Sequence, residues 1–358
     1  MKKWQKQLQN SITTLDQLKK SIRLSVEEEE AIKTVRSKWS ITPHILSLMD
    51  KDDPACPIRR QFVPSLAEKK NVYGQEDFLY KHENWDKEPD RPHSVARQYH
   101  DRVAFLVSQV CATYCRHCLR KEAIMEENKF GLRFDIEEGF QWIREHKEIR
   151  DILFTGGDPF LLPDEKIEYL IARAREIPHV QMIRFGSRTL VTLPDRITAR
   201  LCKILKGYHK VPIWINTQVN HPREITEKTA RAAYKLTCCG INIGNQTVLL
   251  RGINDDVAVF KELNQKLLAI RIRPYYLYAC NMAPRIDHFR VPLETGLKLI
   301  HEGIRGHTSG LAQPHYVITT NLGKIMLNDE YYIVNKSPTK WTLRNHNGEI
   351  IAIPNPPA

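Results

Sequence analysis

Residues 103–118 have the sequence Val103-Ala-Phe-Leu-Val107-Ser-Gln-Val-Cys111-Ala-Thr-Tyr-Cys115-Arg-His-Cys118, an apolar run that leads into three closely spaced cysteines. Offsets of four and three residues let three thiolates bind three irons of a cubane iron–sulfur cluster and leave its fourth iron open. Such clusters usually have four cysteine ligands. An open iron can instead chelate a small molecule, which is how S-adenosylmethionine is reductively cleaved to a 5′-deoxyadenosyl radical. The stretch therefore suggests a radical enzyme in which a strand carries the cysteines.

Zinc binding and disulfide formation are the other uses of clustered cysteines. Structural zinc takes four ligands in tetrahedral geometry, and the remaining cysteines form no second Cys-x-x-Cys pair: they are Cys56, Cys202, Cys238, Cys239 and Cys280. The opening Met1-Lys2-Lys3-Trp4 is not followed by the apolar segment of a secretory signal, so we expect no disulfide framework. The open cluster is the favoured interpretation, and a zinc site is the alternative.

Composition limits the classes of protein to consider. The length of 358 residues allows one large or two ordinary domains, and 42% hydrophobic residues can bury a substantial core. A mean hydropathy of −0.44 with no long apolar run predicts no membrane span. The net charge of +12 would suit nucleic acid, but acidic residues are interspersed among the basic ones, so we expect no such partner. Free thiols and an oxidisable cluster predict a cytoplasmic location.

Strand-like and helix-like segments alternate along most of the chain. Residues 1–95 show the spacing of apolar residues typical of helices. The segment Lys87–His93 contains two prolines and several charged residues, which indicates a break between this region and the next. The predicted strands are Val103–Val107, Ile152–Phe154, Met182–Phe185, Val211–Ile215, Ile241–Asn245 and Ile272–Leu277. The predicted helices between and after them are Ile136–His146, Glu165–Arg175, Ile197–Leu205, Glu224–Leu236, Val257–Leu268 and Leu293–Ile304. Six such units predict an α/β fold with a parallel sheet, a partial (β/α)6 barrel related to the TIM barrel.

Three regions follow from this pattern. Residues 1–95 form a helical N-terminal region, residues 96–305 form the partial barrel, and residues 306–358 form a small C-terminal extension with its own short strands. In barrels of this kind, the active site lies at the C-terminal ends of the strands. The cysteines follow the first predicted strand, where that rule places a site.

Polar residues follow the other predicted strands. The second ends in Gly156-Gly157-Asp158-Pro159, where paired glycines permit close backbone approach to a ligand and Asp158 can accept hydrogen bonds. This motif also occurs in ordinary turns, but after a strand in a three-cysteine protein it suits the methionine ammonium group of S-adenosylmethionine. The third, fourth and fifth strands lead into Gly186-Ser187-Arg188, Asn216-Thr217-Gln218 and Asn245-Gln246.

Lys324, in Asn321-Leu322-Gly323-Lys324-Ile325, is a further candidate. A lysine after a glycine is more often a surface turn residue. A lysine can also form a Schiff base with pyridoxal phosphate, which stabilises charge or spin beside an amino nitrogen. Nothing in the local sequence distinguishes these two interpretations.

A family resemblance extends over nearly the whole chain. It is carried by Tyr99-His100-Asp101-Arg102, the cysteine motif, Gly156-Gly157-Asp158, Arg184-Phe185-Gly186-Ser187-Arg188, Asn220-His221-Pro222, Asn245–Gly252, Pro274–Tyr278, His288-Phe289-Arg290, His307–Gly310 and Gly323-Lys324. With these motifs the chain resembles the lysine 2,3-aminomutase family of radical enzymes. The resemblance implies a partial barrel that uses a [4Fe-4S] cluster, S-adenosylmethionine and pyridoxal 5′-phosphate.

The same resemblance implies roles for individual residues. Cys111, Cys115 and Cys118 would ligate the cluster, Lys324 would carry pyridoxal phosphate, and Arg120 would bind the substrate α-carboxylate, a task that suits a guanidinium fork. Gly157, Asp158, Ser187 and Gln246 match positions around S-adenosylmethionine. The family also implies a reducing donor of the flavodoxin or ferredoxin type and allows a homo-oligomer.

Two positions depart from the pattern of the lysine enzymes, which grip the distal ammonium of the substrate with two aspartates. Here Asn281 and Thr319 stand at or near those places. A buried ammonium without a carboxylate partner costs several kcal/mol. We therefore expect a radical aminomutase that converts an α-amino acid with a neutral or acidic side chain to a β-amino acid, and not one for free lysine.

Two alternatives stay open at this point. One is a related enzyme that acts on a lysyl residue of a translation factor, where the +12 charge would help to dock an acidic protein. The other is a non-catalytic iron–sulfur or zinc-binding module. That module would have no need for Arg120, Asp158 or Lys324.

Overall fold

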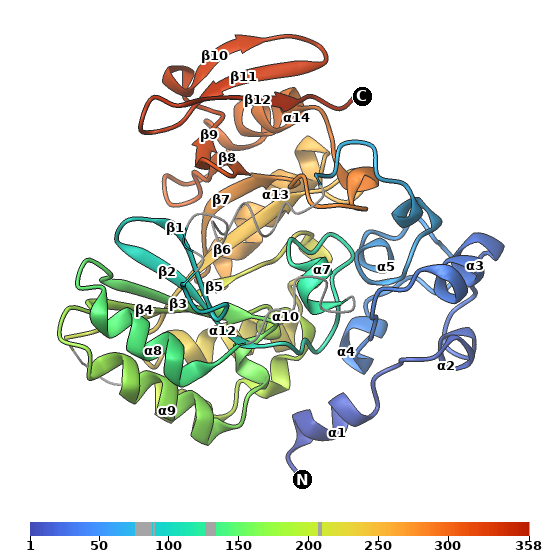
Figure 1. The fold of residues 1–358 in the computed structure, drawn as a ribbon. Helices are drawn as coiled ribbons and strands as arrows, with labels where there is room; N and C mark the ends of the chain where they lie inside the picture. Colours follow the sequence, from blue (N-terminus) through green and yellow to red (C-terminus); the bar gives the residue numbers. More distant parts are fainter. Residues whose placement is uncertain (76–87, 89, 126–133, 207–209, 358) are drawn as a thin grey trace.

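The computed structural model describes residues 1–75, 88, 90–125, 134–206 and 210–357, and its main feature is a nine-stranded sheet curved into a nearly closed barrel (Figure 1). In sheet order the strands are β1 (Val95–Tyr99), β2 (Arg102–Ser108), β3 (Asp151–Gly156), β4 (Met182–Gly186), β5 (Ile213–Thr217), β6 (Asn242–Leu249), β7 (Arg273–Ala279), β8 (His315–Thr320) and β9 (Gly323–Met326). Strands β2 to β8 run parallel. At one edge β1 pairs antiparallel with β2, and at the other β9 pairs antiparallel with β8.

The six predicted strands are confirmed, but the sheet is larger than predicted. It continues into β8 and β9, which lie beyond the boundary that the sequence analysis placed at residue 305. The sixth predicted helix, Leu293–Ile304, connects β7 to the parallel strand β8, so a seventh parallel strand follows it. The short apolar segment Tyr316–Ile318 supplies that strand and is buried.

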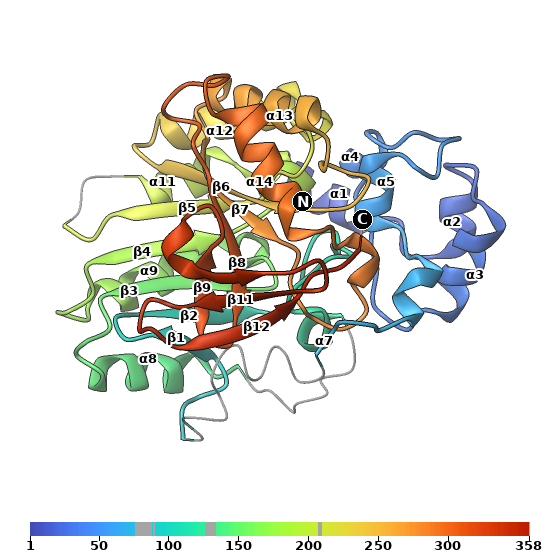
Figure 2. The same cartoon turned by 90° about the horizontal axis from the view of Figure 1, so that it is seen from above.

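Helices cover the outer face of the sheet (Figures 1 and 2). They are α8 (Ile136–Glu145), α9 (Asp164–Arg175), α11 (Ala199–Leu205), α12 (Glu227–Thr237), α13 (Val257–Ala269) and α14 (Leu293–Lys298), the last continuing as a π-helical segment, Leu299–Ile304. Asp135, Thr226 and Asp256 cap three of them by accepting a hydrogen bond from the backbone N–H three residues on. The six predicted helices are thus confirmed.

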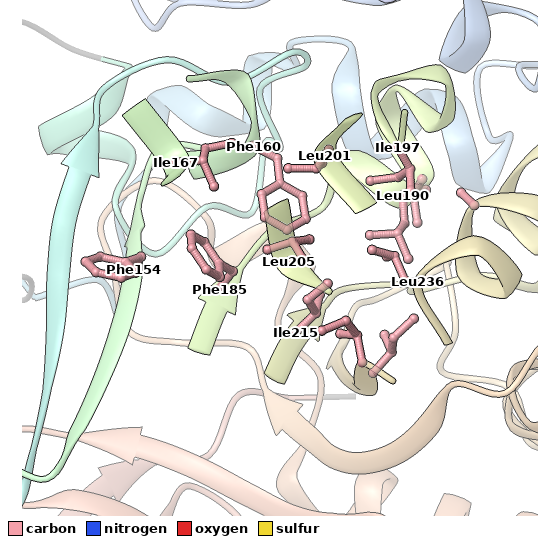
Figure 3. Close-up of a cluster of buried hydrophobic side chains, with 14 of the residues drawn as sticks. Phe154, Phe160, Ile167, Phe185, Leu190, Ile197, Leu201, Leu205, Ile215 and Leu236 are labelled. Atoms are coloured by element: carbon pink, nitrogen blue, oxygen red, sulfur yellow. The ribbon is translucent and has the colours of Figure 1, made fainter. Parts of the chain in front are cut away.

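The two faces of the strands differ in chemistry because successive side chains point to opposite faces. Phe154, Phe185 and Ile215 are fully buried on the outer side against side chains of the helical layer (Figure 3). Their neighbours Thr155, Arg184 and Asn216 line a cavity inside the barrel. The outer face holds the core, and the inner face is left for polar chemistry.

Side chains close the barrel between its two edge strands. Gln98 of β1 donates from Nε2 to the Thr320 carbonyl at 2.8 Å, and the Lys324 N–H donates to the Tyr99 hydroxyl at 2.9 Å. In the described sheet β1 and β9 are not ladder neighbours. We call this junction of β1 with the β8–β9 hairpin the seam.

Smaller units flank the barrel. The N-terminal region contains α1 (Lys3–Gln9), α2 (Leu15–Lys19), α3 (Val26–Thr34), α4 (Pro43–Leu46), α5 (Pro57–Phe62) and a 3-10 turn, Leu66–Lys69. The chain ends in a three-stranded antiparallel sheet of β10 (Ile333–Lys336), β11 (Lys340–Arg344) and β12 (Ile350–Pro354). The predicted boundary at Lys87–His93 lies partly outside the described residues. No helix in the described ranges is long and apolar enough to cross a bilayer.

Candidate active site

A cavity of about 640 Å³ occupies the barrel interior. All of the predicted site residues line it: Cys111, Cys115, Cys118, Arg120, Gly157, Asp158, Ser187, Gln246, Asn281, Thr319 and Lys324. They come from strands and strand ends along the whole sheet, from the loop after β2 to β9, and are brought together by the curvature of the sheet. The structure thus places in one cavity what the sequence distributes over more than half of its length.

The N-terminal region makes polar contacts with the cysteine loop, residues 111–118, and with the short segment that follows it. Glu68 contacts the guanidinium of Arg116 at 2.5 and 2.9 Å and the Lys121 ammonium at 2.5 Å, and all three side chains are buried. Burial opposes ionisation of Glu68, but the two cations outweigh it and lower the pKa of the carboxyl to about 2. The Arg116 N–H also donates to the Gln61 carbonyl at 2.8 Å. We call these four residues the clamp.

The three thiols fit a multi-iron cluster. Burial, and then the nearby Asp158 carboxylate and the other two cysteines, raise the pKa of Cys111 well above its usual value, and burial raises the pKa of Cys118 to about 11. A bound cation would stabilise these sulfurs as thiolates. In the described parts of the chain, no three His, Cys, Asp or Glu side chains are arranged around a single metal ion. A cubane places each thiolate on a different iron, so it does not require such convergence.

The glycine pair after β3 serves the protein's own backbone. The Gly157 N–H donates to the Ser108 carbonyl at 2.6 Å, and the Asp158 N–H donates to the Val110 carbonyl at 2.9 Å. A Cβ on Gly157 would lie 2.5 Å from the Val110 carbonyl oxygen. Both glycines also line the cavity, so the approach of a ligand to their backbone stays a prediction, while the Cβ side of Gly157 is occupied by the segment that leads into the cysteine loop.

Asp158 has three donors from the protein itself. Its carboxylate accepts from the Ser187 hydroxyl at 2.7 Å, the Arg188 N–H at 2.9 Å and the Phe160 N–H at 3.0 Å. Burial raises the pKa of this carboxyl despite those hydrogen bonds. Asp158 therefore ties the end of β3 to the end of β4 beneath the cysteine loop.

Lys324 faces the cavity rather than solvent. It is opposite Thr319 in the β8–β9 ladder, so the two side chains share a face, and its ammonium lies 5.2 Å from the centre of the Tyr99 ring. Gly323 has a φ of +98°, which favours glycine at this turn. Burial and then the charges of Arg184 and Arg102 lower the pKa of Lys324 to about 8. A lysine that loses its proton this readily is a competent nucleophile.

Two arginines near Lys324 were missed by the sequence analysis. Arg102 is the first residue of β2, and Arg184 lies on β4, where its Nε donates to Asp151 at 2.8 Å. Both belong to strands whose outward residues are apolar, and both line the cavity. A charged residue inside an otherwise apolar strand was the signal that could have identified them.

The wall formed by β6 and β7 is aromatic. A register shift after Asn245 brings both Tyr275 and Tyr276 to the cavity, and a Cβ on Gly244 would lie 2.7 Å from the Tyr275 ring. Gln246, predicted to lie near S-adenosylmethionine, hydrogen-bonds the Tyr275 hydroxyl. The glycine here makes room for a ring.

The predicted substrate-binding residues lie at the same cavity. Arg120 precedes the short helix α7 (Lys121–Ile124), and Asn281 follows β7, with 8% of its surface exposed. The Oδ1 atom of Asn281 is buried and accepts no hydrogen bond from the described residues. Among the described lining residues the carboxylates are Asp151 and Asp158, and both are engaged by the contacts given above.

Two family models match the chain. The radical SAM superfamily model covers residues 105–263, and the lysine-2,3-aminomutase model covers residues 301–358. The first match contains the cysteine loop and strands β3 to β6. The second contains β8, β9 and Lys324.

Curated relatives match over the full chain. An L-lysine 2,3-aminomutase of Clostridium subterminale is 44% identical over 99% of this chain and 84% of its own length, and one of Bacillus subtilis is 43% identical over 99% and 74%. A glutamate 2,3-aminomutase of Clostridioides difficile is 40% identical over 99% and 83%. The cavity, its cysteines and its lysine thus occur in a chain that belongs to the lysine 2,3-aminomutase family of radical SAM enzymes.

Proposed function

We propose that this protein is a pyridoxal-phosphate-dependent radical aminomutase that moves an amino group from C2 to C3 of an amino acid with a neutral or acidic side chain. The observation that carries the proposal is that the three cysteines and Lys324 line one cavity. The family relatives named above support the reaction class, since they include both lysine and glutamate 2,3-aminomutases.

The chain's residues suit the groups that this chemistry requires. When bound, the cluster supplies the electron that cleaves S-adenosylmethionine, and pyridoxal phosphate delocalises spin from the amino nitrogen. Cys111, Cys115 and Cys118 would hold the cluster. Lys324, whose pKa is lowered to about 8, would hold the pyridoxal group, and its cationic neighbours Arg102 and Arg184 would bind the phosphate.

Arg120 would bind the α-carboxylate of the substrate. It lies two residues after Cys118 and lines the same cavity as Lys324. A guanidinium fork binds a carboxylate through two parallel hydrogen bonds, which fixes orientation as well as position. That orientation would hold C3 of the substrate for hydrogen transfer, which needs reacting atoms within about 3–3.5 Å.

The substrate class follows from the charges of the lining. Both carboxylates among the described lining residues already have partners, and Asn281 and Thr319 are uncharged. A distal ammonium would therefore be desolvated without a counter-charge, whereas the buried Oδ1 of Asn281 suits a neutral side chain that donates a hydrogen bond. This favours a substrate other than free lysine.

An amino-acid panel tests the proposal. The full chain, reconstituted anaerobically with iron, sulfide, pyridoxal phosphate and S-adenosylmethionine, is reduced, and β-amino acid products are scored by mass spectrometry. We expect conversion of a neutral or acidic amino acid, and no conversion by the Lys324→Ala variant. A lysyl residue presented in a folded acidic protein serves as a comparison substrate.

Two outcomes would contradict the proposal in different ways. Efficient conversion of free lysine, with kcat/KM near 10⁴ M⁻¹s⁻¹ or above (a level of about that size is ordinary for enzymes), would contradict the substrate class. Absence of any β-amino acid from the panel, with S-adenosylmethionine still cleaved, would contradict the aminomutase reaction.

A further inference from the structure

Arg188 lines the cavity and makes several polar contacts, but the proposed function gives its side chain no role. It follows β4, and its guanidinium donates to the Cys115 sulfur at 2.7 Å, the Gln61 side-chain oxygen at 2.6 Å and the Gln218 carbonyl at 3.1 Å. It also lies 4.9 Å above the Phe62 ring. Only 9% of its surface is exposed. This side chain is held rigidly with one N–H directed at a cysteine that would bind the cluster.

The charge of Arg188 is balanced by one buried carboxylate. Glu224 contacts the guanidinium at 2.9 Å, and its side chain is fully buried. Its other oxygen accepts from the Gln61 amide and from the backbone N–H groups of Asn220 and His221. Arg188 and Glu224 thus form a fixed pair in which the cation lines the cavity and contacts the Cys115 sulfur, whereas Glu224 does not line the cavity.

We propose that Arg188 is a positioning residue that raises the reduction potential of the cluster through its charged hydrogen bond to Cys115, with Glu224 setting how much of that charge the cluster senses. This inference rests on the proposed function, because it takes Cys115 as a cluster ligand. Gln61 and Phe62, from α5, hold the guanidinium in place. The N-terminal region would therefore influence the redox chemistry of the site.

The sign of the effect follows from electrostatics. Reduction adds one electron from the donor to the [4Fe-4S] cluster and changes its charge from 2+ to 1+, with no proton taken up and no bond made or broken. A cation beside a ligand sulfur stabilises the more negative, reduced form more than the oxidised form. Hydrogen bonds to the sulfurs are among the features that set the potential of such clusters.

Two variants of opposite expected sign test the proposal. The double change Arg188→Met with Glu224→Gln removes the cation together with its counter-charge, and we expect it to lower the equilibrium constant for reduction about tenfold, which corresponds to about 59 mV for one electron. Glu224→Gln alone leaves the cation less compensated, so we expect the potential to rise. The readout is the EPR signal of the reduced cluster, titrated against potential in the reconstituted full chain.

Arg196 and Asp164 provide a matched control. They form another buried ion pair, at 2.8 Å, with the Arg196 guanidinium 4.7 Å above the Trp4 ring, and neither lines the cavity. Arg196→Met with Asp164→Asn should leave the potential unchanged. A merely structural role of Arg188 would make the two double variants behave alike.

The possible outcomes distinguish a failure of the role proposed for Arg188 from a failure of the proposed aminomutase function. Unshifted potentials in both Arg188 and Glu224 variants, or shifts of the same sign, would overturn the inference while leaving the enzyme's reaction in place. If Arg188→Met with Glu224→Gln fails to hold iron, the sign of the shift in Glu224→Gln alone decides. A wild-type chain that binds no cluster would overturn the proposed function itself.

Discussion

The cysteine loop and the β8–β9 hairpin face the same cavity but are held in different ways. The loop is fixed by buried ion pairs to Glu68, by a backbone hydrogen bond from Arg116 to Gln61, and by Arg188, and the Val110 carbonyl just before it accepts from the Asp158 N–H. The hairpin pairs with β7 on one side and meets β1 across the seam through single side chains on the other. The difference indicates that the cysteine end of the cavity is preorganised and that the hairpin end is more adjustable.

The largest expected effect is at the loop. Cys115→Ala removes one of three ligands that the clamp holds in place, and we expect it to abolish both iron binding and cleavage of S-adenosylmethionine. The wild type should hold about four irons per chain, the content of a cubane. Iron and sulfide analysis with an assay for 5′-deoxyadenosine measures both. Cys202→Ala, which changes a cysteine remote from the cavity, is the control. A fully active Cys115→Ala protein would contradict the radical mechanism.

Lys324→Ala should separate the two ends of the cavity. We expect it to lose both the visible absorbance of bound pyridoxal phosphate and detectable aminomutase activity, because the residue proposed to hold the cofactor is gone. Slow cleavage of S-adenosylmethionine should persist, because the loop is untouched. Borohydride trapping and peptide mapping should locate the cofactor at position 324 in the wild type. Trapping at another lysine would contradict the assignment.

Substrate choice tests whether the hairpin end can be redesigned. Asn281→Asp with Thr319→Asp supplies two carboxylates near the distal end of the substrate, and loss of one partner of a buried charge pair costs roughly 3–5 kcal/mol. We therefore expect preference to shift toward lysine by about two to four decades. Competition between lysine and the native substrate gives the ratio of kcat/KM values. Thr319→Val is the uncharged control, and an unchanged ratio would show that another group reads the distal end.

The clamp makes a prediction about stability. Glu68→Gln leaves Arg116 and Lys121 buried without their anion, so the free energy of unfolding should fall by roughly 3–5 kcal/mol. Because the pKa of Glu68 is lowered to about 2, its contribution is present above the ordinary value of 4.5 and is lost as pH falls through 2. Urea denaturation at neutral pH measures the loss. Glu227→Gln, which breaks an exposed pair with Arg231, should cause no measurable change.

The smallest expected effect is a shift of a pH profile. Lys324 has its pKa lowered to about 8 from 10.5, so its charged form costs stability below pH 8, and that cost is relieved as pH rises toward 10.5. The rate of pyridoxal phosphate attachment should rise about tenfold per pH unit and level off near pH 8. Arg102→Gln removes one of the charges that lower this pKa and should move the plateau upward. A plateau that stays near pH 8 in Arg102→Gln would show that burial and Arg184 set the pKa without Arg102.

The sequence predicted the barrel well because its outer face follows the spacing of strands and helices. Phe154, Phe185 and Ile215 mark strands by their apolar character, and helices recur between them at regular distances. The strand β8 was assigned to the C-terminal extension and not to the barrel sheet, because its apolar segment is short and follows the last helix without another helix after it. The cysteine loop and Lys324 were identifiable from motifs and from family resemblance.

The contacts between distant segments could not be predicted. Arg188 lies 73 residues from Cys115 and 127 from Gln61 in the sequence, and no local pattern shows that their side chains meet. The glycine pair at 156–157 also approaches the Ser108 and Val110 backbone, a contact that the local sequence does not show because that segment belongs to the end of another strand. Spacing within one element is visible in a sequence, whereas spacing between elements depends on the curvature of the sheet.

The seam has a consequence for how the chain folds while it is being synthesised. Tyr99 and Lys324 are separated by 225 residues, and ribosomes synthesise roughly 5–20 residues per second, so β1 waits about 11–45 s for its partner (225/20 to 225/5). The cysteine loop and all residues of the clamp have left the ribosome by then. Until the β8–β9 hairpin is made, β1 lacks the contacts of the seam, so the side of the nascent sheet next to β1 stays open after the cysteine loop has been synthesised.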